Sequence, residues 1–337
     1  MINKIRHHMI GLFGSGSWAT AIVKILLEKQ DREIYWWVRE HEIVEGLLSE
    51  GHNPFYLSEA YIDINRVHLT SDINDVADHC DDLFLVVPSA FVAGALKSLT
   101  SAQLERKHFI SAVKGVVPET NQIVTDYLRD TLKVQPSNMA IVSGPSHAEE
   151  TARNRLTYLT VASGNKALVK HVRDILDCHY VKTSGSTDMQ GIEYGAVLKN
   201  IYAIATGICH GLGYGDNIIA VLISNAMQEM DTFLHHIEPL DSRKLEEYAY
   251  LGDLLVTCYS QFSRNRTFGS MIGFGYTVKA AQLEMKMVAE GYYAVNGIEK
   301  MRSAMNISMP IEEAVYRILY KKESASKVMK PVVENFQ

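Results

Sequence analysis

Residues 9–27 read MIGLFGSGSWATAIVKILL, which is an apolar strand, a glycine-containing turn and an apolar helix in succession. In the first βα unit of a dinucleotide-binding fold, Gly14 permits the tight turn and Gly16 lets the backbone approach a pyrophosphate. The small residue Ala19 lets the helix pack close to the strand. The start of such a helix offers N–H groups and a partial positive charge to phosphates. Taken alone, these residues also fit an ordinary strand-to-helix turn.

A second strand is predicted at residues 34–38, where the apolar run IYWWV ends at Arg39. At this point the dinucleotide-binding fold contacts the adenosine ribose, and an acidic residue there favours NAD. Arg39 instead permits a 2′-phosphate and therefore NADP, while the neighbouring Glu40 keeps NAD open. We expect NAD or NADP as the cofactor.

The composition indicates a globular protein of two domains. The chain has 337 residues, of which 47% are hydrophobic, so it can bury a large core. Its formal net charge of −6 lacks the basic excess that nucleic-acid binding needs. We therefore expect no nucleic-acid partner.

The four cysteines are far apart in the sequence and form no C-x-x-C pair. We expect neither a metal site nor a disulfide framework. The N-terminus lacks a signal-peptide pattern, so cytoplasmic residence is expected. An apolar stretch at residues 194–212 approaches membrane-spanning length but contains Lys199, Asn200 and His210, which favours a buried helix over a membrane span.

Three continuous apolar runs are typical of strands buried on both faces of a parallel sheet. They lie at residues 83–87, 108–113 and 139–142, and each is followed by small or charged residues. Because the carboxyl ends of strands border the ligand crevice in open α/β sheets, we expect these ends to share one site with the glycine turn. Residues 157–162 and 179–182 are predicted to extend the sheet.

The pattern changes near Asp188, after which apolar residues follow the helical period. Helices are predicted at 191–212, 217–238, 241–259, 277–289, 294–305 and 311–321, and the polar tail from Glu323 gives no assignment. The expected fold class is therefore α/β, with a Rossmann-type dinucleotide-binding domain at 1–188. An all-α substrate-binding and catalytic domain is expected at 189–337.

Lys199 lies in a helical stretch with apolar residues on every side. Burial lowers the pKa of an ammonium group toward the range in which it can accept a proton. Oxidation of an alcohol needs such a base while the hydride leaves for a nicotinamide. The alternative is a lysine whose stem packs on the core and whose ammonium reaches water.

Lys114 closes a buried strand, where an ammonium can bind a phosphate or carboxylate or polarise a carbonyl oxygen. A solvated strand end is its alternative. The loop Ser263-Arg264-Asn265-Arg266 suits a small anion, because guanidinium groups match phosphate oxygens, although an ordinary solvated loop fits as well. Asp253 stands in an apolar background, where it pairs with a lysine or a substrate hydroxyl, or caps a helix.

In order along the chain, these pieces resemble the bacterial-type NAD(P)-dependent glycerol-3-phosphate dehydrogenases. The resemblance covers nearly the whole chain and implies a Rossmann domain followed by an all-helical domain of the 6-phosphogluconate dehydrogenase C-terminal type. The matching stretches are GSGSWATA at 14–21, VVPS at 86–89, KG at 114–115, SGPSHA at 143–148, GAVLKN at 195–200, GLGYGDN at 211–217, LGDL at 251–254, SRNR at 263–266, FG at 268–269 and EG at 290–291.

The resemblance also implies roles for individual residues. Lys199 would be the proton acceptor, with Lys114 and Asp253 as further catalytic groups. The cofactor would contact Gly14, Gly16, Ser17, Trp18, Arg39, Lys114, Ala148, Arg264, Val288 and Glu290. Glycerol 3-phosphate would contact Lys114, Gly144, Ser146, Lys199, Asp253, Ser263, Arg264 and Asn265.

The chain departs from the family pattern at several positions. Ala19 stands where many members have glycine, Ala196-Val197 replaces Gly-Ala, and Tyr250 replaces a glycine. Ile219 and Asn225 stand where the family commonly has Lys and Arg. If those cations help to hold the substrate phosphate or a subunit contact, affinity or assembly would differ.

The activity implied is the NAD(P)-dependent interconversion of sn-glycerol 3-phosphate and dihydroxyacetone phosphate, an oxidoreductase reaction that supplies glycerol 3-phosphate for phospholipid biosynthesis. The partners expected are this small-molecule substrate and, given the long helical part, a second copy in a homodimer. The alternatives are a related dehydrogenase of another small acid and a catalytically inactive nucleotide-binding regulator. The loops at 143–146 and 263–266 argue against the first, and retention of both lysines with Asp253 argues against the second.

Overall fold

The computed structural model describes residues 9–285 and 289–336, which form two compact units. The first unit contains residues 9–87, Phe91–Val113 and Val124–Met189. The second contains the rest of the described chain, including the two short segments Pro88–Ala90 and Lys114–Ile123. The chain therefore enters the second unit twice before it stays there from Gln190 onward.

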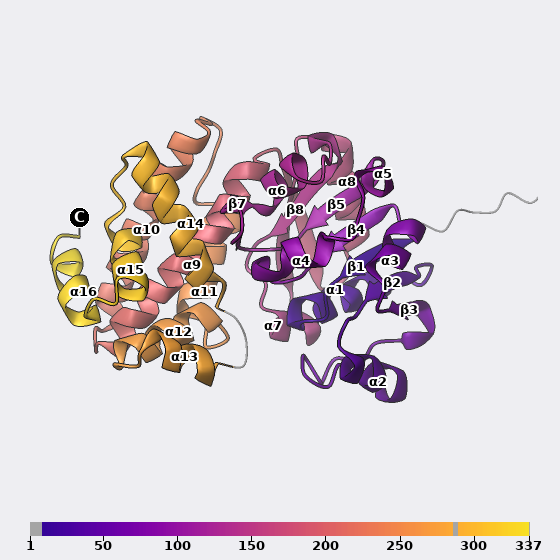
Figure 1. Ribbon diagram of the computed structural model, residues 1–337, viewed down its shortest axis with the longest axis horizontal. Coiled ribbons are helices and arrows are strands. Elements are labelled where there is room, and N and C mark those ends of the chain that lie inside the picture. The colour runs from indigo at the N-terminus through magenta and orange to yellow at the C-terminus, as the bar shows by residue number, and fades with distance from the viewer. Residues whose placement is uncertain (1–8, 286–288, 337) are drawn as a thin grey trace, which may run out of the picture. The chain divides into compact units, whose positions relative to one another are not determined.

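The first unit is built on an eight-stranded sheet with the order β10-β9-β8-β5-β4-β1-β2-β3. Figure 1 labels β3, β2, β1, β4, β5 and β8 of this sheet. Six of these strands, in the order β3-β2-β1-β4-β5-β8, pair in parallel with the strand order of a Rossmann fold. β9 pairs antiparallel with β8. The strands are β1 (Ile10–Phe13), β2 (Ile34–Trp37), β3 (Val67–Thr70), β4 (Asp82–Leu85), β5 (His108–Ser111), β8 (Met139–Ser143), β9 (Thr157–Ala162) and β10 (Val181–Ser186).

Helices cover both faces of this sheet, because successive side chains of a strand point to opposite sides. Ile10 and Leu12 of β1 belong to the core that includes helix α1 (Ser17–Leu27) and helix α8 (Lys166–Leu176). Gly11, between them, faces Val76 on the other side. The central strands β1, β4 and β8 are accordingly buried along their whole length, which agrees with the predicted α/β fold class.

The remaining helices of the first unit are short. Val76 lies in α3 (Ile73–His79), which begins where the side chain of Asp72 accepts a hydrogen bond from the N–H of Asn74. Helix α8 was not predicted, although Asn165 caps it by accepting hydrogen bonds from two backbone N–H groups. The other helices are α2 (His41–Glu50), α4 (Val92–Leu96), α5 (Ser101–Leu104), α6 (Val124–Asp130) and α7 (Ala148–Ala152).

The second unit is helical around α9 (Met189–Gly211), whose residues 191–209 are all buried. A helix that is apolar on every side belongs in a core rather than at a surface. Around it lie α10 (Asp216–Ile237), α11 (Asp253–Tyr259), α12 (Arg264–Gly273), α13 (Val278–Glu284), α14 (Glu290–Met305), α15 (Pro310–Tyr320) and α16 (Ala325–Glu334). The hairpin of β6 (Val116–Val117) and β7 (Gln122–Ile123) also belongs to this unit.

Three expectations for the helical part were wrong. The predicted helix 241–259 starts only at a π-helical turn, Tyr248–Gly252, because α10 ends before Pro239 and turns follow it. Residues 264–266 begin a helix instead of forming a loop. The helix expected at 277–289 ends at Glu284, because Met285 is extended. The tail, for which no assignment was made, contains α16, with Pro331 inside it.

Within the described residues, no helix is long and apolar enough to cross a membrane. Residues 194–209 of the apolar stretch are buried in α9, and His210 near its end is exposed.

The helices α9 and α12 pack backbone to backbone. A Cβ atom added to Gly269 of α12 would collide with the carbonyl oxygen of Ile204 on α9. One turn further along each helix, Gly273 and Gly211 repeat the same contact. Glycine is needed here because any side chain would push apart the two helices that carry the polar cluster described below.

Replacing Gly269 with alanine should destabilise the protein by about 1–3 kcal/mol, since overpacking costs that much in a well-packed core. The matched control is Gly94→Ala in α4, where nothing lies within 4 Å of an added Cβ. There we expect no loss, and a gain of up to about 1 kcal/mol from helix propensity. Chemical denaturation of both variants measures the difference, and equal stabilities would contradict the close packing.

Candidate active site

The turn between β1 and α1 leaves the start of the helix open. Gly14 has φ +122°, a conformation that L side chains rarely adopt, and it lies against the carbonyl of Val86. Gly16 is the N-cap residue, no side chain of the described residues caps the helix there, and nothing lies within 4 Å of an added Cβ. Ser17 and Trp18 form the first turn, which contains no acidic residue. This end of α1 therefore fits an anionic group such as a pyrophosphate.

Arg39 and Glu40 follow β2 and interact with one another. The guanidinium of Arg39 donates a hydrogen bond to Glu40 at 3.0 Å, and the hydroxyl of Ser15 donates to the other carboxylate oxygen at 2.6 Å. Burial would raise the pKa of Glu40, but the hydrogen bonds from Ser15 and Arg39 lower it. The carboxylate of Glu40 and the exposed guanidinium of Arg39 thus lie together beside the glycine turn. The residue that favours NAD and the residue that permits NADP are therefore neighbours in the structure.

The loop after β8 carries the other predicted residues of the first unit. Gly144 directly follows the strand, and its carbonyl accepts a hydrogen bond from the hydroxyl of Ser146 at 3.0 Å. Ala148 is the buried first residue of α7. All three lie beyond the carboxyl end of a sheet strand, where open α/β sheets bind ligands.

In the second unit, α9 holds Lys199 inside a polar cluster. Lys199 is 4% exposed, so it is buried rather than extended to water. Its ammonium donates hydrogen bonds to Asp253 Oδ1 and, at 3.0 Å, to Thr257 Oγ1. Both partners lie on α11, so this contact joins the central helix to its neighbour.

The carboxylate of Asp253 binds a second lysine. Lys114 Nζ lies 3.2 Å from Asp253 Oδ2, and the carboxylate, 1% exposed, thus bridges two ammonium groups. The Lys114 side chain is 19% exposed, so it is neither a solvated strand end nor fully enclosed. Asp253 is therefore paired with both lysines, and its apolar sequence neighbours correctly indicated that the side chain is buried.

The electrostatics of this cluster make a neutral amine accessible to Lys199 near neutral pH. Burial lowers the pKa of Lys199 to about 7, with the Lys114 charge acting in the same direction and Asp253 opposing it. Burial would raise the pKa of Asp253, but the two lysines lower it below its usual range. Asp253 therefore stays ionised at neutral pH while Lys199 can gain or lose a proton.

A chain of amide groups fixes the backbone around this cluster. Gly291 N–H donates to Asn265 Oδ1 at 2.9 Å, and Asn265 Nδ2 donates to Asn200 Oδ1 at 2.9 Å. Asn200 Nδ2 in turn donates to the carbonyl of Lys114 at 2.6 Å. Helices α14, α12 and α9 thus hold the Lys114 backbone in place, and the predicted contact of Asn265 with substrate stays a prediction.

The segment expected to be an arginine-rich loop is the start of α12. Ser263 is its N-cap, and its buried hydroxyl accepts a hydrogen bond from the N–H of Arg266 at 3.3 Å. A serine before a helical run is a common N-cap signal, so the sequence already contained this information. Arg264, in the first turn, is exposed.

Glu290 opens α14 beside the segment Pro88–Ala90. Its carboxylate accepts hydrogen bonds from the hydroxyl of Ser89 and, at 3.0 Å, from the Ser89 N–H. Burial raises the pKa of Glu290, while Ser89 and the charge of Arg264 reduce that shift. The predicted cofactor residue Val288 lies outside the described residues.

Thr257 and Ser89 were not predicted as site residues. Thr257 had a usable signal, because it follows Asp253 by four residues and so lies on the same helix face. Ser89 follows the predicted strand 83–87, whose end was expected to border the site, but nothing indicated its partner Glu290, which is 201 positions away. Within the second unit, the structure brings together Lys114, Lys199 and Asp253. The expectation that they share one crevice with residues of the first unit stays a prediction.

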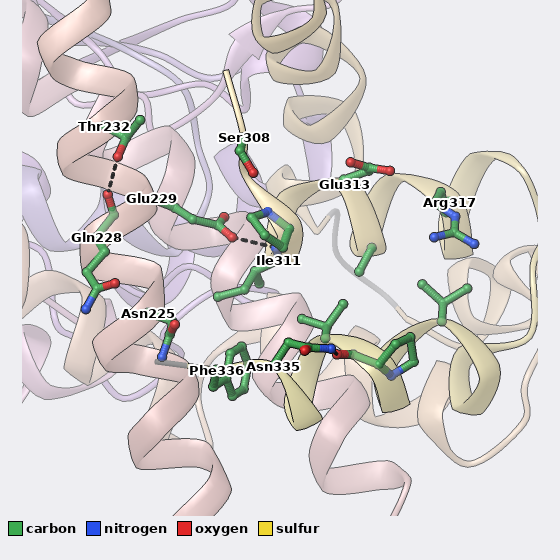
Figure 2. Close-up of a pocket in the computed structure, with 15 residues that line it drawn as sticks. Asn225, Gln228, Glu229, Thr232, Ser308, Ile311, Glu313, Arg317, Asn335 and Phe336 are labelled. Atoms are coloured by element: carbon green, nitrogen blue, oxygen red, sulfur yellow. Dashed lines mark hydrogen bonds between the residues drawn. The ribbon is translucent and has the colours of Figure 1, made fainter. Parts of the chain in front are cut away.

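A cavity of about 560 Å³ lies elsewhere in the second unit, lined by residues of α10, α15 and α16 (Figure 2). Glu229 points from α10 toward the start of α15, where it accepts the N–H of Ile311 at 2.5 Å. Asn225, one of the two residues that replace expected cations, also lines the cavity, whereas Ile219 is buried. The cavity contains none of the predicted site residues.

Comparison with known families gives matches over both parts of the chain. Residues 9–169 match the N-terminal model of NAD-dependent glycerol-3-phosphate dehydrogenase, and residues 188–330 match the C-terminal model. A glycerol-3-phosphate dehydrogenase [NAD(P)+] of Salinibacter ruber is 35% identical over 93% of this chain and 90% of the relative. The enzyme of the same name from Staphylococcus haemolyticus is 32% identical over 93% of each.

Solved structures agree with these matches. A glycerol-3-phosphate dehydrogenase from Coxiella burnetii superimposes with a TM-score of 0.90 and 29% identity, covering 97% of this chain and 99% of the other. The enzyme from Saccharomyces cerevisiae has a TM-score of 0.79 at 23% identity and shares the fold over 98% of this chain and 100% of the other.

The charges around Lys199 predict opposite pKa changes in two variants. In Asp253→Asn the pKa of Lys199 should fall below about 7, because the opposing anion is lost. In Lys114→Met it should rise, because a like charge is removed. Isotope-labelled lysine side chains titrated by NMR report this pKa directly, and a shift in the same direction for both variants would refute the described pairing.

Proposed function

Because the chain belongs to the NAD-dependent glycerol-3-phosphate dehydrogenase family, we propose that it interconverts sn-glycerol 3-phosphate and dihydroxyacetone phosphate with NAD(H) or NADP(H). The observation that carries this proposal is the buried ammonium of Lys199, held by Asp253 and Thr257. A base of this kind is what an alcohol must meet when it loses a proton and a hydride together.

Lys199 is the proton acceptor of the oxidation and the proton donor of the reduction. Its pKa of about 7 gives comparable amounts of both forms at neutral pH, which suits a group that must act in both directions. Thr257 and Asp253 fix the nitrogen so that the proton moves at one place. Glycerol 3-phosphate would give its C2 hydroxyl proton to the Lys199 amine while its C2 hydrogen leaves as hydride, and the loss of both would produce the ketone.

Lys114 and Asp253 organise the charge around that step. We assign the Lys114 ammonium, which also binds Asp253, to polarising the substrate carbonyl, whose oxygen needs positive charge nearby as the alkoxide develops. Asp253 prevents the two lysines from repelling one another, since its carboxylate binds both. The amide chain through Asn200 keeps the Lys114 backbone from moving away.

The substrate phosphate needs further cationic and hydroxyl groups. We assign Arg264, Ser263 and Asn265 at the start of α12 to this role, together with Gly144 and Ser146 after β8. An exposed guanidinium at a helix N-terminus supports the assignment, because both groups attract phosphate oxygens.

The open start of α1 fits a dinucleotide cofactor, as its uncapped N-terminus and the space at Gly16 indicate. Gly14, Gly16, Ser17 and Trp18 would hold the pyrophosphate end, and Arg39 the adenosine end. Ala148, Lys114, Arg264, Glu290 and Val288 are assigned to the remainder. When bound, the cofactor supplies or accepts the hydride.

The product would supply the glycerol backbone of phospholipids. Cytoplasmic residence is part of the proposal and is supported by the four cysteines, all of which are free thiols. The homodimer also stays a proposal. Apolar side chains exposed at Leu255, Tyr259 and Phe262 support it, because a second copy would remove them from water.

Lys199→Ala should lower the turnover of dihydroxyacetone phosphate by about 10²- to 10⁴-fold, the usual contribution of a positioned acid or base. Lys279→Ala is the control, because that lysine is exposed on α13. NADH and NADPH oxidation followed by absorbance measures both, with circular dichroism to confirm folding. A folded Lys199→Ala protein with full turnover, or a wild type without turnover, would refute the proposal.

The pH dependence of glycerol 3-phosphate oxidation should follow the protonation state of Lys199. Oxidation needs neutral Lys199, so kcat/KM for glycerol 3-phosphate should rise as pH rises through about 7 and then level off. Below that pKa the amine is protonated and cannot accept the substrate proton. A rate that falls over this interval would contradict the assignment of Lys199 as base.

Arg39→Ala should raise KM for NADPH by about tenfold or more, because a charge-assisted hydrogen bond to the 2′-phosphate is lost. KM for NADH should change little. Glu40→Gln is the converse control, since removing the carboxylate should lower KM for NADPH. An unchanged KM for NADPH in Arg39→Ala would exclude Arg39 from cofactor selection.

A further inference from the structure

Two histidines and an aspartate meet at the amino ends of neighbouring strands in the first unit. Asp82 is the first residue of β4 and His108 the first residue of β5, and the two are paired in register. His171 approaches them from α8. The glycine turn follows the carboxyl end of β1, which is parallel to β4, so this cluster lies at the opposite edge of the sheet.

The Asp82 carboxylate is enclosed and holds one imidazole on each oxygen. His108 Nδ1 lies 2.7 Å from Oδ1, and His171 Nε2 lies 2.8 Å from Oδ2. The carboxylate has no exposed surface, whereas the side chains of His108 and His171 are 34% and 30% exposed. Solvent therefore reaches the rings but not the oxygens.

These three groups have the atoms and the spacing of a metal-ligand set. One ligand atom from each residue lies within 4.8 Å of the other two. Imidazole nitrogen and carboxylate oxygen are ordinary zinc ligands at about 2.1 Å, which places two tetrahedral ligands about 3.4 Å apart. To admit an ion, the two present contacts of 2.7 and 2.8 Å must open to about 3.4 Å, and the widest separation between ligand atoms, at most 4.8 Å, must close toward the same value. A water molecule from the solvent side would complete four-coordination.

The surrounding charges do not exclude a cation. The positive charge of Arg32 interacts with Asp82 and His171. Its guanidinium donates hydrogen bonds to the carbonyls of Ile175 and Asp174. The Asp174 side chain acts on His171 with the opposite sign. The Asp82 carboxylate thus supplies the negative charge of the site.

We propose that Asp82, His108 and His171 bind one transition-metal dication of the zinc type, in a structural site separate from the residues assigned to hydride transfer. Each imidazole binds through the nitrogen that now faces Asp82, and its ring proton moves to the other nitrogen. The ion would cross-link β4, β5 and α8, which are far apart in the sequence. The sequence did not indicate this site, because its ligands are separated by 26 and 89 positions from Asp82.

The test uses the full chain, freed of metal by a chelator and titrated with Co²⁺ alone. We expect one equivalent to bind with the visible absorption of four-coordinate cobalt, to be displaced by Zn²⁺, and to raise the melting temperature. His108→Asn and His171→Asn should each weaken binding at least tenfold. His68→Asn is the control, since that exposed histidine on β3 lies outside the cluster and should bind Co²⁺ as the wild type does.

A further variant guards against misfolding of the asparagine variants. His171→Cys keeps a ligand at this position and should add a thiolate-to-cobalt charge-transfer band in the near ultraviolet, which the wild type lacks. The proposal is overturned if the wild type binds no stoichiometric Co²⁺. It is also overturned if binding persists unchanged in both asparagine variants, or if the cysteine variant binds cobalt without the new band.

Discussion

The buried carboxylate of Asp253 is the constraint on which the rest of the second unit depends. A carboxylate cannot be taken out of water without a charged or hydrogen-bonding partner, and here both lysines bind the one buried aspartate. Two sets of contacts hold the helices that carry this cluster in position. The glycine contacts set the spacing of α9 and α12, and the amide chain holds the Lys114 backbone.

Much of the fold follows from local sequence pattern. Strands buried on both faces read as continuous apolar runs, so β4, β5 and β8 were found within about two residues of their ends. The short helix α2 buries only Ile43 and Leu47, so its apolar signal is weak, whereas α8 was missed although it has an N-cap and five buried apolar residues at helical spacing. The error at residues 241–247 has a physical origin as well, since charged helix formers there follow Pro239 and lack an apolar face to bury.

The site was predictable as a set of residues but not as a geometry. Lys199 and Asp253 each looked unusual because a charged side chain stood in an apolar stretch. Their pairing spans 54 positions, and that of Lys114 with Asp253 spans 139, so only the folded chain brings them together. The pairing of Ser89 with Glu290 was not predictable for the same reason, because the two residues are 201 positions apart in the sequence. Local signals identify which groups are costly to bury, and tertiary structure decides which partner compensates them.

The two excursions of the chain into the second unit have a consequence for its modularity. Lys114 is encoded among residues of the sheet yet binds Asp253 with the helices. A gene fragment beginning at residue 190 would lack this lysine, and the Asn200 amide would lose the carbonyl that it binds. The helical part is therefore not a cassette that recombination can exchange at one junction. Any functional swap between relatives must carry the segment 114–123 along with it, which couples the evolution of the two halves of the chain.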